Sequence, residues 1–460
     1  MTVVSRRRFL GAAAAGITGS AAGSVLSACS ASPRPAAVHA NGTGRATALL
    51  RAGSRPFPSR RAGTDMLPKI RHVVVLMMEN HSFDNYFGML GRGDGFSLDG
   101  SGSPTNANPA PDGSTVVATH ATSVCQAHVD VSQSWTASHT AWDHGKNDGF
   151  VRATGPDPMH YFTGEDLPFY YSLGRTFPLC DRWFASVMAQ TYPNRKFLLA
   201  GSAFGLVDDS FPSQAAHPLR SNGPTTIFES LDAHGIDWKD YYSDLPSVLL
   251  FPYLASSAHT GRFVKMNQFF TDAAAGTLPF FSMVEPNYGT GSEENPQDVR
   301  NGELFASQVI NAVMTSPAWS STVLFWLYDE HGGYYDHVPP QPAVPPDDIA
   351  PNVSSAAMEG DHYSYTGFRV PAVVVSPWAR RDYVSHVVHD HTSILKFVAT
   401  KWNLPALSDR DANASNLLDT LDLQASTPPF LTPPALAAPA GVGPGEVASC
   451  TAASAAPASS

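Results

Sequence analysis

The sequence predicts an α/β fold with a mostly parallel central sheet that is covered by helices on both faces. Three unbroken apolar runs, rich in β-branched residues, are typical of buried parallel strands: residues 72–78, 322–328 and 370–376. Segments 225–234 and 303–315 have helical character, and Gly235 is well placed to end the first of them. Strands that alternate with helices indicate a layered α/β architecture.

Length and composition fit one large core or two smaller ones, and the many Gly and Pro residues predict plentiful loops. The chain has 460 residues, of which 43% are hydrophobic, so it can bury a sizeable core. Its formal net charge is -11. A protein this acidic is a poor candidate for nucleic-acid binding, because phosphate backbones are neutralised by Lys and Arg. Clusters of acidic residues favour metal cations instead.

Composition divides the chain into four segments. Residues 1–29 have the character of an export signal, and residues 30–65 form a linker rich in Ala, Arg, Pro, Gly and Ser. Residues 66–426 contain no low-complexity break, so we expect one large domain there. Residues 427–460 are rich in Pro, Ala, Ser and Thr, which predicts a disordered tail.

The N-terminal segment begins with an arginine run and continues into a short, weakly apolar stretch. Arg6 and Arg7 resemble the pair of the twin-arginine export signal, so we expect the export machinery of that pathway as a partner. The apolar stretch is too short for a membrane span. Leu26–Cys29 resembles a lipoprotein cleavage box. The protein is therefore expected either at the cell surface, anchored through a lipid on Cys29, or secreted after ordinary cleavage.

Three cysteines follow this segment: Cys125, Cys180 and Cys450. An odd number in an exported protein leaves at least one of them unpaired. Because Cys450 falls in the expected tail, Cys125–Cys180 is the plausible internal bridge, although the sequence alone does not establish it.

Acidic residues directly follow two of the predicted strands. Glu79 and Asn80 come after residues 72–78, and Asp329 and Glu330 come after residues 322–328. The carboxyl ends of strands in an open α/β sheet border the ligand crevice. Carboxylates that meet there repel each other unless a cation lies between them. Either pair alone could be a helix cap or a solvated loop, but both together predict a metal site.

Thr191 is the candidate nucleophile. A threonine hydroxyl reacts poorly at neutral pH unless a base or a metal activates it, and beside a divalent cation it could attack phosphorus. Arg195, four residues later, would hold a phosphate oxygen or pair with an acid. Spacing alone favours a different interpretation of Thr191, as the N-cap of a helix.

Several segments resemble the bacterial phospholipases C and the related acid phosphatases. The matching motifs occur in the expected order between about residues 70 and 403: Glu79–Gly88, Leu167–Phe184, Thr191–Arg195, Asp329–Val338 and Asp390–Ser393. The resemblance implies an alkaline-phosphatase-like α/β/α sandwich with a mostly parallel central sheet. It therefore identifies the expected domain 66–426 as a phosphoesterase catalytic domain.

The resemblance also implies roles for individual residues. Its metal ligands match Glu79, Asn80, Asp329 and Glu330, and the nucleophile Thr191 would also touch the ion. The ion would be divalent, and oxygen-rich ligands suit calcium, magnesium, manganese or zinc.

Histidines complete the implied site. His139 matches a pocket histidine that binds phosphate or protonates the leaving group. His331, His337 and His391 would either contact the substrate or support the residues that do.

One motif departs from the family pattern. Where relatives commonly have an acidic residue, histidine and proline, this chain has Glu294, Asn295 and Pro296. Asn295 can still donate a hydrogen bond to a phosphate oxygen, but it carries no proton at neutral pH. Leaving-group protonation would then come from elsewhere, with His139 as the candidate.

The expected function is hydrolysis of phospholipid head-group phosphodiesters through a phospho-threonine intermediate. A phospholipid or a small phosphate ester would be the substrate, and the membrane surface a second partner. One alternative is a phosphomonoesterase of the acid phosphatase type. Another is a surface lipoprotein that binds phosphate or lipid without catalysis, with Asn295 as a sign of decay, although the intact set from Glu79 to Glu330 argues against it.

Overall fold

The computed structural model describes residues 48–210, 223–251, 254, 259, 261–353, 361–441 and 450. The chain divides into two units, residues 1–49 and residues 50–460. The twin-arginine pair, Cys29 and residues 30–47 of the linker lie outside the described residues, so the export expectations remain predictions.

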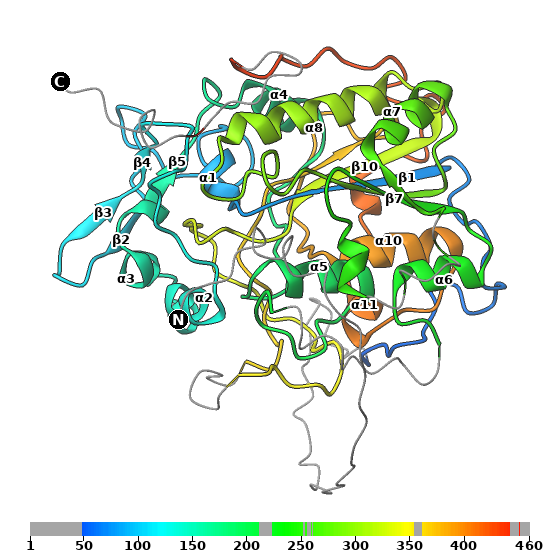
Figure 1. Ribbon diagram of the computed structural model, residues 1–460, viewed down its shortest axis with the longest axis horizontal. Helices are drawn as coiled ribbons and strands as arrows, with labels where there is room; N and C mark the ends of the chain where they lie inside the picture. Colours follow the sequence, from blue (N-terminus) through cyan, green and yellow to red (C-terminus); the bar gives the residue numbers. More distant parts are fainter. Residues whose placement is uncertain are drawn as a thin grey trace, which may run out of the picture. The chain divides into compact units, whose positions relative to one another are not determined.

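An eight-stranded sheet forms the centre of the second unit (Figure 1). From one edge to the other its strands are β12 (Val384–Ser385), β6 (Leu179–Cys180), β11 (Ala372–Val375), β10 (Thr322–Tyr328), β1 (His72–Met78), β9 (Phe281–Glu285), β7 (Trp238–Tyr242) and β8 (Phe263–Lys265). The five strands from β10 to β8 pair in parallel, whereas β11 is antiparallel to both β10 and β6. This confirms the expected mostly parallel sheet.

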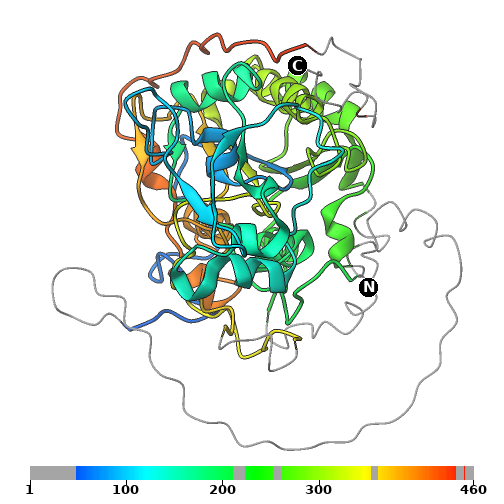
Figure 2. The same cartoon turned by 90° about the vertical axis from the view of Figure 1, so that its left-hand side faces the viewer.

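Helices cover both faces of the sheet. In Figure 1, α4 (Pro168–Thr176), α7 (Met266–Ala275) and α8 (Val299–Met314) lie above it. Below it lie α5 (Thr191–Ala200), α6 (Ile227–Ala233), α10 (Thr392–Trp402) and α11 (Asp409–Asn413). Figure 2 shows the same layers from the side. The α/β/α arrangement follows from strands that are apolar on both faces and must be covered twice.

A smaller lobe stands beside one end of the sheet (Figure 1). It contains the hairpin β2 (Ala107–Pro109) and β3 (Thr115–Val117), the pair β4 (Thr119–His120) and β5 (His160–Tyr161), and the short helices α2 (Trp135–Trp142) and α3 (Phe150–Thr154). Helix α1 (Phe83–Phe87) begins a few residues after β1.

The strands and helices follow the local sequence signals closely. β1 and β10 coincide with two of the three predicted runs, and every residue of both strands is buried. The third run, residues 370–376, forms the shorter strand β11, which is antiparallel and not parallel as predicted. Helix α6 begins with a capping box made by Thr226 and Glu229, and Gly235 follows its end with φ of 66°. These local features explain why the boundaries could be predicted.

Two predictions at the borders of the domain are wrong in part. Residues 50–65 were expected to be a flexible linker, but they bind the domain through the side chain of Asn403, which donates to the carbonyls of Phe57 (2.9 Å) and Arg60 (3.0 Å). Residues 427–441 were expected to be disordered, yet Phe430 is buried and its amide donates to the carbonyl of Pro377. Composition gave no sign of these contacts because they join each segment to residues far away in the sequence.

The predicted Cys125–Cys180 bridge is also wrong. Cys125 pairs with Cys450, with Cα atoms 5.3 Å apart, whereas Cys180 is a buried free cysteine in β6. Cys180 is fixed in the interior of the sheet, so it cannot reach the loop of Cys125. The tail cysteine reaches that loop instead.

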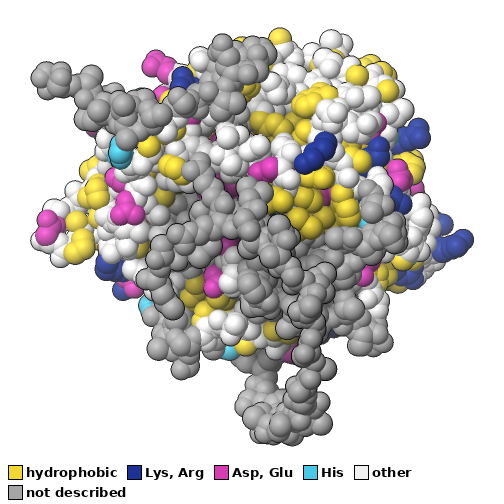
Figure 3. All heavy atoms as spheres, viewed as in Figure 1, with side chains coloured by type: hydrophobic (Ala, Val, Ile, Leu, Met, Phe, Trp, Pro, Cys, Tyr) yellow, Lys and Arg dark blue, Asp and Glu magenta, His cyan; other side chains and the backbone are white. Residues whose placement is uncertain are grey.

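The surface is mixed in character. Figure 3 shows exposed hydrophobic side chains between charged ones, with Lys and Arg mainly at the right-hand edge of the visible face. Among the described residues, no helix has the length and apolarity that a membrane crossing requires.

Candidate active site

Parallel pairing of β1 and β10 brings the two acidic motifs together. Met78 and Tyr328 are register partners at the ends of these strands, so Glu79 and Asp329 emerge side by side. The amide of Asp329 donates to the carbonyl of Met78 (3.2 Å), and the amide of Asn80 donates to Oδ1 of Asp329 (3.2 Å). The predicted convergence of residues 250 positions apart is therefore present in the structure.

The backbone turns sharply after β1 and again after β10, which brings Asn80 and Gly332 close together. Asn80 has a positive φ of 68°, and Gly332 packs directly against it. A Cβ atom on Gly332 would lie 2.0 Å from the carbonyl oxygen of Asn80, so only glycine fits there. Gly332 and Gly333 both have positive φ, which lets the backbone turn tightly beside Asn80.

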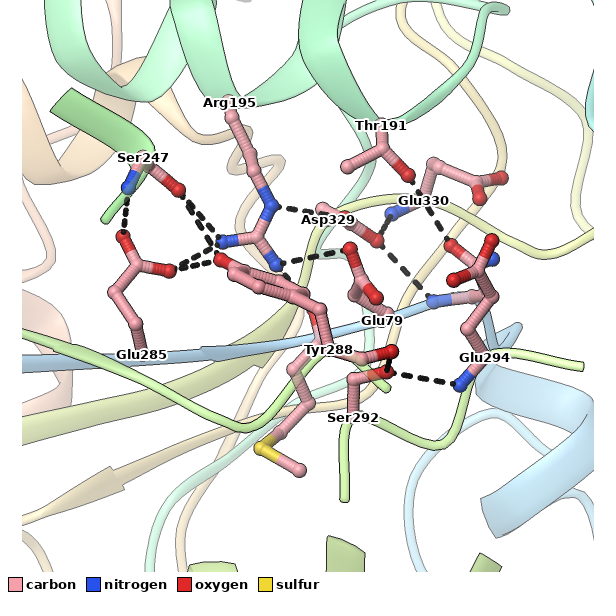
Figure 4. Close-up of polar contacts among 12 residues, drawn as sticks. Glu79, Thr191, Arg195, Ser247, Glu285, Tyr288, Ser292, Glu294, Asp329 and Glu330 are labelled. Carbon is pink, nitrogen blue, oxygen red and sulfur yellow. Dashed lines mark hydrogen bonds and ion pairs between the residues drawn. The ribbon is translucent and has the colours of Figure 1, made fainter. Parts of the chain in front are cut away.

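Helix α5 delivers Thr191 to the same place. The Thr191 hydroxyl donates to Oδ1 of Asn80 (3.4 Å), and Figure 4 shows the side chain pointing from α5 towards Glu330. The helix N-cap is Gln190, not Thr191, so the interpretation of Thr191 as a cap is wrong by one residue. Its hydroxyl is thereby free of capping and faces the carboxylates.

Arg195 lies one turn further along α5 and is completely buried. Its Nε donates to Asp329 (3.1 Å), and its Nη1 donates to Glu285 (2.9 Å) and Ser247 (3.2 Å). Nη2 donates to the carbonyl of Met78 and lies 3.7 Å from Glu79. These contacts favour the second of the two roles considered for Arg195, pairing with acids, over direct binding of phosphate.

The site holds more negative than positive charge. Glu79, Asp329 and Glu330 are all buried, and Arg195 is the cation in contact with the first two (Figure 4). Burial raises the pKa of Glu330 well above its ordinary value, and the charges of Asp329, Asp209 and Glu79 raise it further.

Oε1 of Glu330 is also buried without a hydrogen-bond partner among the described residues. An orphaned carboxylate oxygen among like charges is what a cation would satisfy, so the residues present fit a divalent metal ion.

Two of the predicted histidines, His331 and His391, lie next to the proposed metal ligands. Nε2 of His391 lies 2.6 Å from the carbonyl of Asp329, and Nε1 of Trp183 donates to Nδ1 of His391 (3.3 Å). Because Nδ1 accepts, Nε2 carries the proton and orients the Asp329 backbone. Burial lowers the pKa of His331 to about 3, so this imidazole is neutral, and its Nε2 has no partner among the described residues.

The ring nitrogens of His139 contact Trp135 and Asp361 and not Thr191. Its Nδ1 lies 2.8 Å from the carbonyl of Trp135, and its Nε2 lies 3.1 Å from the Asp361 carboxylate. The described contacts do not join it to Thr191 or to Glu79, Asp329 and Glu330, so its catalytic role remains a prediction.

Asn295 contacts the active-site loop that follows β10. Its Oδ1 accepts a hydrogen bond from Oη of Tyr334 (3.2 Å), and its buried Nδ2 has no partner among the described residues. An unsatisfied donor of this kind is available to a ligand, which is compatible with the predicted hydrogen bond to phosphate.

A second group of potential metal ligands lies nearby along the chain. Ligand atoms of Asp84, Asp336 and His337 all lie within 4.8 Å of one another. Arg369 already pairs with this group, because its Nε donates to Asp336 (2.8 Å) and its Nη2 to Asp84 (3.0 Å). His337 was predicted to contact or support the substrate site, and its Nδ1 instead contacts Asp84 at 2.7 Å.

Sequence reasoning missed Glu285 and Asp209. Glu285 ends β9, an apolar strand next to β1, so the signal that found Glu79 and Asp329 was present there too. Asp209 lies in a loop without any such pattern, and only the fold brings it to the start of α5, where it accepts from the amide of Tyr192 (2.7 Å).

Comparison with known proteins decides the family. A model of the Phosphoesterase family matches residues 70–405 of this chain. The chain belongs to the Phosphoesterase family. The matched region contains β1, α5, β10 and the site that they form.

Relatives of this Phosphoesterase family member are named phospholipases C. The chain is 29% identical to the non-hemolytic phospholipase C of Pseudomonas aeruginosa over 391 residues, which cover 75% of this chain and 55% of that protein. It is 28% identical to phospholipase C B of Mycobacterium tuberculosis, covering 82% of this chain and 81% of that one. It is 31% identical to non-specific phospholipase C1 of Arabidopsis thaliana, covering 79% and 73%.

The chain therefore spans only about half the length of the Pseudomonas relative. Among solved structures, an alkaline phosphatase superfamily protein from Vibrio parahaemolyticus aligns with a TM-score of 0.37 and 10% identity, covering 80% of this chain and 72% of that one. The family and its relatives identify this chain as a phosphoric ester hydrolase.

Proposed function

We propose that this phosphoesterase is an exported phospholipase C that cleaves phospholipid head-group phosphodiesters with Thr191 as nucleophile. The observation that carries the proposal is the position of the Thr191 hydroxyl, 3.4 Å from Asn80 at the ends of β1 and β10. Relatives named phospholipase C support a diesterase over a monoesterase.

A divalent metal ion would be held by Glu79, Asn80, Asp329 and Glu330, together with Thr191. Such an ion supplies charge neutralisation at the phosphoryl oxygens and lowers the pKa of the attacking hydroxyl. Ser247 and Glu285 hold Arg195, and Arg195 holds Asp329, so the carboxylates are already oriented before any substrate arrives. This preorganisation reduces the cost of assembling the charged site.

The reaction would proceed in two displacements at phosphorus. The Thr191 hydroxyl loses its proton to solvent and Oγ1 forms a bond to phosphorus as the bond to the diacylglycerol oxygen breaks, and the leaving alkoxide takes up a proton. A water molecule then attacks the same phosphorus, the bond to Thr191 Oγ1 breaks, one proton of the water returns to Oγ1, and the phosphorylated alcohol is released. Asn295 Nδ2, buried and without a partner among the described residues, would donate a hydrogen bond to a phosphoryl oxygen.

His139 is the proposed proton donor to the leaving group, although it is paired with Asp361 in the structure. Protonation from His139 would require the imidazole to exchange its contact with Asp361 for one with the substrate. Nitrophenolate leaves without taking up a proton, whereas the alkoxide of a phospholipid needs one. If His139 supplies that proton, His139→Asn should lose less activity on nitrophenyl esters than on phospholipid. Equal losses on both substrates would contradict it.

The test of the proposed function compares two nitrophenyl substrates. Hydrolysis of a nitrophenyl phosphocholine diester and of a nitrophenyl phosphate monoester should be measured on wild type, Thr191→Ala and Thr191→Ser. We expect the diester to be preferred, Thr191→Ala to lose at least about three orders of magnitude in kcat, and Thr191→Ser to retain part of it.

A matched control is Thr400→Ala, a buried helical threonine whose hydroxyl donates to the carbonyl of Lys396. It should retain wild-type kcat. Preference for the monoester would favour the acid phosphatase alternative, and a fully active Thr191→Ala would exclude the mechanism. Hydrolysis of neither ester by the metal-loaded protein would favour a binding lipoprotein.

Export through the twin-arginine pathway is part of the same proposal. Replacing Arg6 and Arg7 with Lys should leave the precursor inside the cell, and Cys29→Ser should release the mature protein from the membrane fraction. Unchanged export of the Lys pair variant would contradict this route.

A further inference from the structure

Asp209 forms a reciprocal pair of hydrogen bonds with the start of α5. Its Oδ1 accepts from the backbone amide of Tyr192 (2.7 Å), and its own amide donates to Oε1 of Gln190 (3.2 Å). Gln190 is the N-cap of α5 and does not cap the helix with its own side chain. A carboxylate from the loop that follows α5 therefore satisfies the helix amide next to Thr191.

That amide is where an anion is normally bound. The first amides of a helix are unsatisfied within the helix and carry the positive end of its dipole, so they bind phosphate oxygens and carboxylates alike. A phosphoryl group attacked by Thr191 must approach this same helix end. In the structure the position is taken by Asp209.

The surroundings show that this end of α5 faces a ligand site and is not an ordinary capped helix. Thr191 directs its hydroxyl to Asn80, and the fully buried Oε1 of Glu330 has no partner among the described residues. Asp209 Oδ1 accepts from the Tyr192 amide at this same helix end, next to Thr191. Asp209 thus adds a negative charge where an anionic substrate has to bind.

We propose that the Asp209 carboxylate occupies the phosphoryl position at the start of α5 in the free protein and is displaced from the Tyr192 amide by the substrate. The inference rests on the proposed function, because it places the phosphate beside Thr191. Asp209 acts as an internal competitor: it keeps the helix end satisfied without substrate and weakens the binding of singly or doubly charged phosphates. Asp209 therefore favours substrates whose other contacts with the protein supply the free energy that its displacement costs.

The test measures inorganic phosphate binding by titration calorimetry on the metal-loaded protein. Asp209→Asn keeps an oxygen that can accept from Tyr192 but removes the charge. We expect the dissociation constant for phosphate to fall at least about tenfold in Asp209→Asn, because a like charge beside the anion has been removed. The KM for the nitrophenyl diester should fall with it.

Asp208→Asn is the matched control. Asp208 is the exposed neighbour, and its carboxylate accepts from the amide of Ser210 (3.0 Å) and not from α5. Asp208→Asn changes the net charge by the same amount, and it should alter the dissociation constant for phosphate by less than about twofold. A similar gain in both variants would show that overall charge is responsible and would overturn the proposal.

The other outcomes are equally decisive. Unchanged or weaker phosphate binding in Asp209→Asn would overturn the proposal, and so would a lower metal content, which would make Asp209 a metal ligand. If Asp209→Asn does not fold, Asp209→Ser removes the charge with a different side chain and is read in the same way.

Failure of the proposed function is separable from failure of this inference. A wild type that hydrolyses no phosphate ester refutes the former, whereas the ratio of phosphate dissociation constants still decides the latter.

Discussion

Arg195 joins Asp329 to Glu285 inside the protein, with Nε 3.1 Å from Oδ2 of Asp329 and Nη1 2.9 Å from Oε2 of Glu285. Both acids stand at the ends of strands, Asp329 after β10 and Glu285 at the end of β9, with β1 between them. The guanidinium of Arg195 therefore connects α5, which contains Thr191, to the edge of the sheet where Asp329 and Glu285 lie (Figure 4). The helix of the nucleophile and the proposed metal ligand Asp329 are therefore joined through one buried side chain.

Replacing Arg195 with Met should destabilise the protein by about 3 to 5 kcal/mol, because the change leaves buried carboxylates without their cation. Chemical denaturation followed by circular dichroism measures this loss. Arg60→Met is the control, since Arg60 is exposed, and should unfold like wild type. A variant of Arg195 with wild-type stability and lowered activity would instead show that this side chain serves the substrate.

A buried glutamate should make stability depend on pH. Burial raises the pKa of Glu293 to about 8, although Tyr170, Tyr328 and Tyr86 bind its carboxylate and oppose the shift. The folded state then holds a proton that the unfolded state loses above its ordinary pKa of 4.5. Stability should therefore be full at low pH and fall between about pH 4.5 and 8, by about 1.4 kcal/mol per pH unit.

Glu293→Gln removes this contribution, because glutamine stays neutral in both states. Unfolding free energies at about pH 5.5 and 7.5 should show wild type losing about 2 to 3 kcal/mol more than the variant. Glu165→Gln, at an exposed position, should keep the wild-type slope. An identical slope for wild type and Glu293→Gln would show that Glu293 is ionised in the folded protein.

The Cys125–Cys450 bridge predicts a specific pattern of thiol reactivity. In a protein that begins after Cys29, alkylation without reduction should label Cys180 alone, and only after denaturation, because Cys180 is buried. Replacing Cys125 and Cys450 with Ser should lower stability by about 2 to 4 kcal/mol. Recovery of a peptide that joins Cys125 to Cys180 would restore the bridge that the sequence favoured.

The parts of the fold that the sequence predicted are those with local signals. β1 and β10 are buried on both faces and therefore appear as unbroken apolar runs, and the polar residues that follow them identify the sheet edge. Motif resemblance supplied Thr191 and its place in the site. Local signals were thus sufficient for the sheet and for the residues at its edge.

Long-range contacts were not predictable in this way. The Cys125–Cys450 disulfide, the contact of Asn403 with the carbonyls of Phe57 and Arg60, and the contact of Asp209 with Tyr192 each join residues that no local sequence pattern relates. Arg195 illustrates a third case, because its sequence allowed two roles and only the positions of Glu285 and Ser247 favour one.

The most direct test of the account is to trap the covalent intermediate on Thr191. Metal-loaded protein is mixed with the nitrophenyl phosphocholine diester, quenched in acid within a turnover, digested and analysed by peptide mass spectrometry. We predict that the peptide containing Thr191 gains the mass of the phosphocholine group, and that Thr191→Ser carries the same adduct on serine. Rapid turnover with an unmodified Thr191 peptide, or with the adduct on another residue, would contradict the central claim.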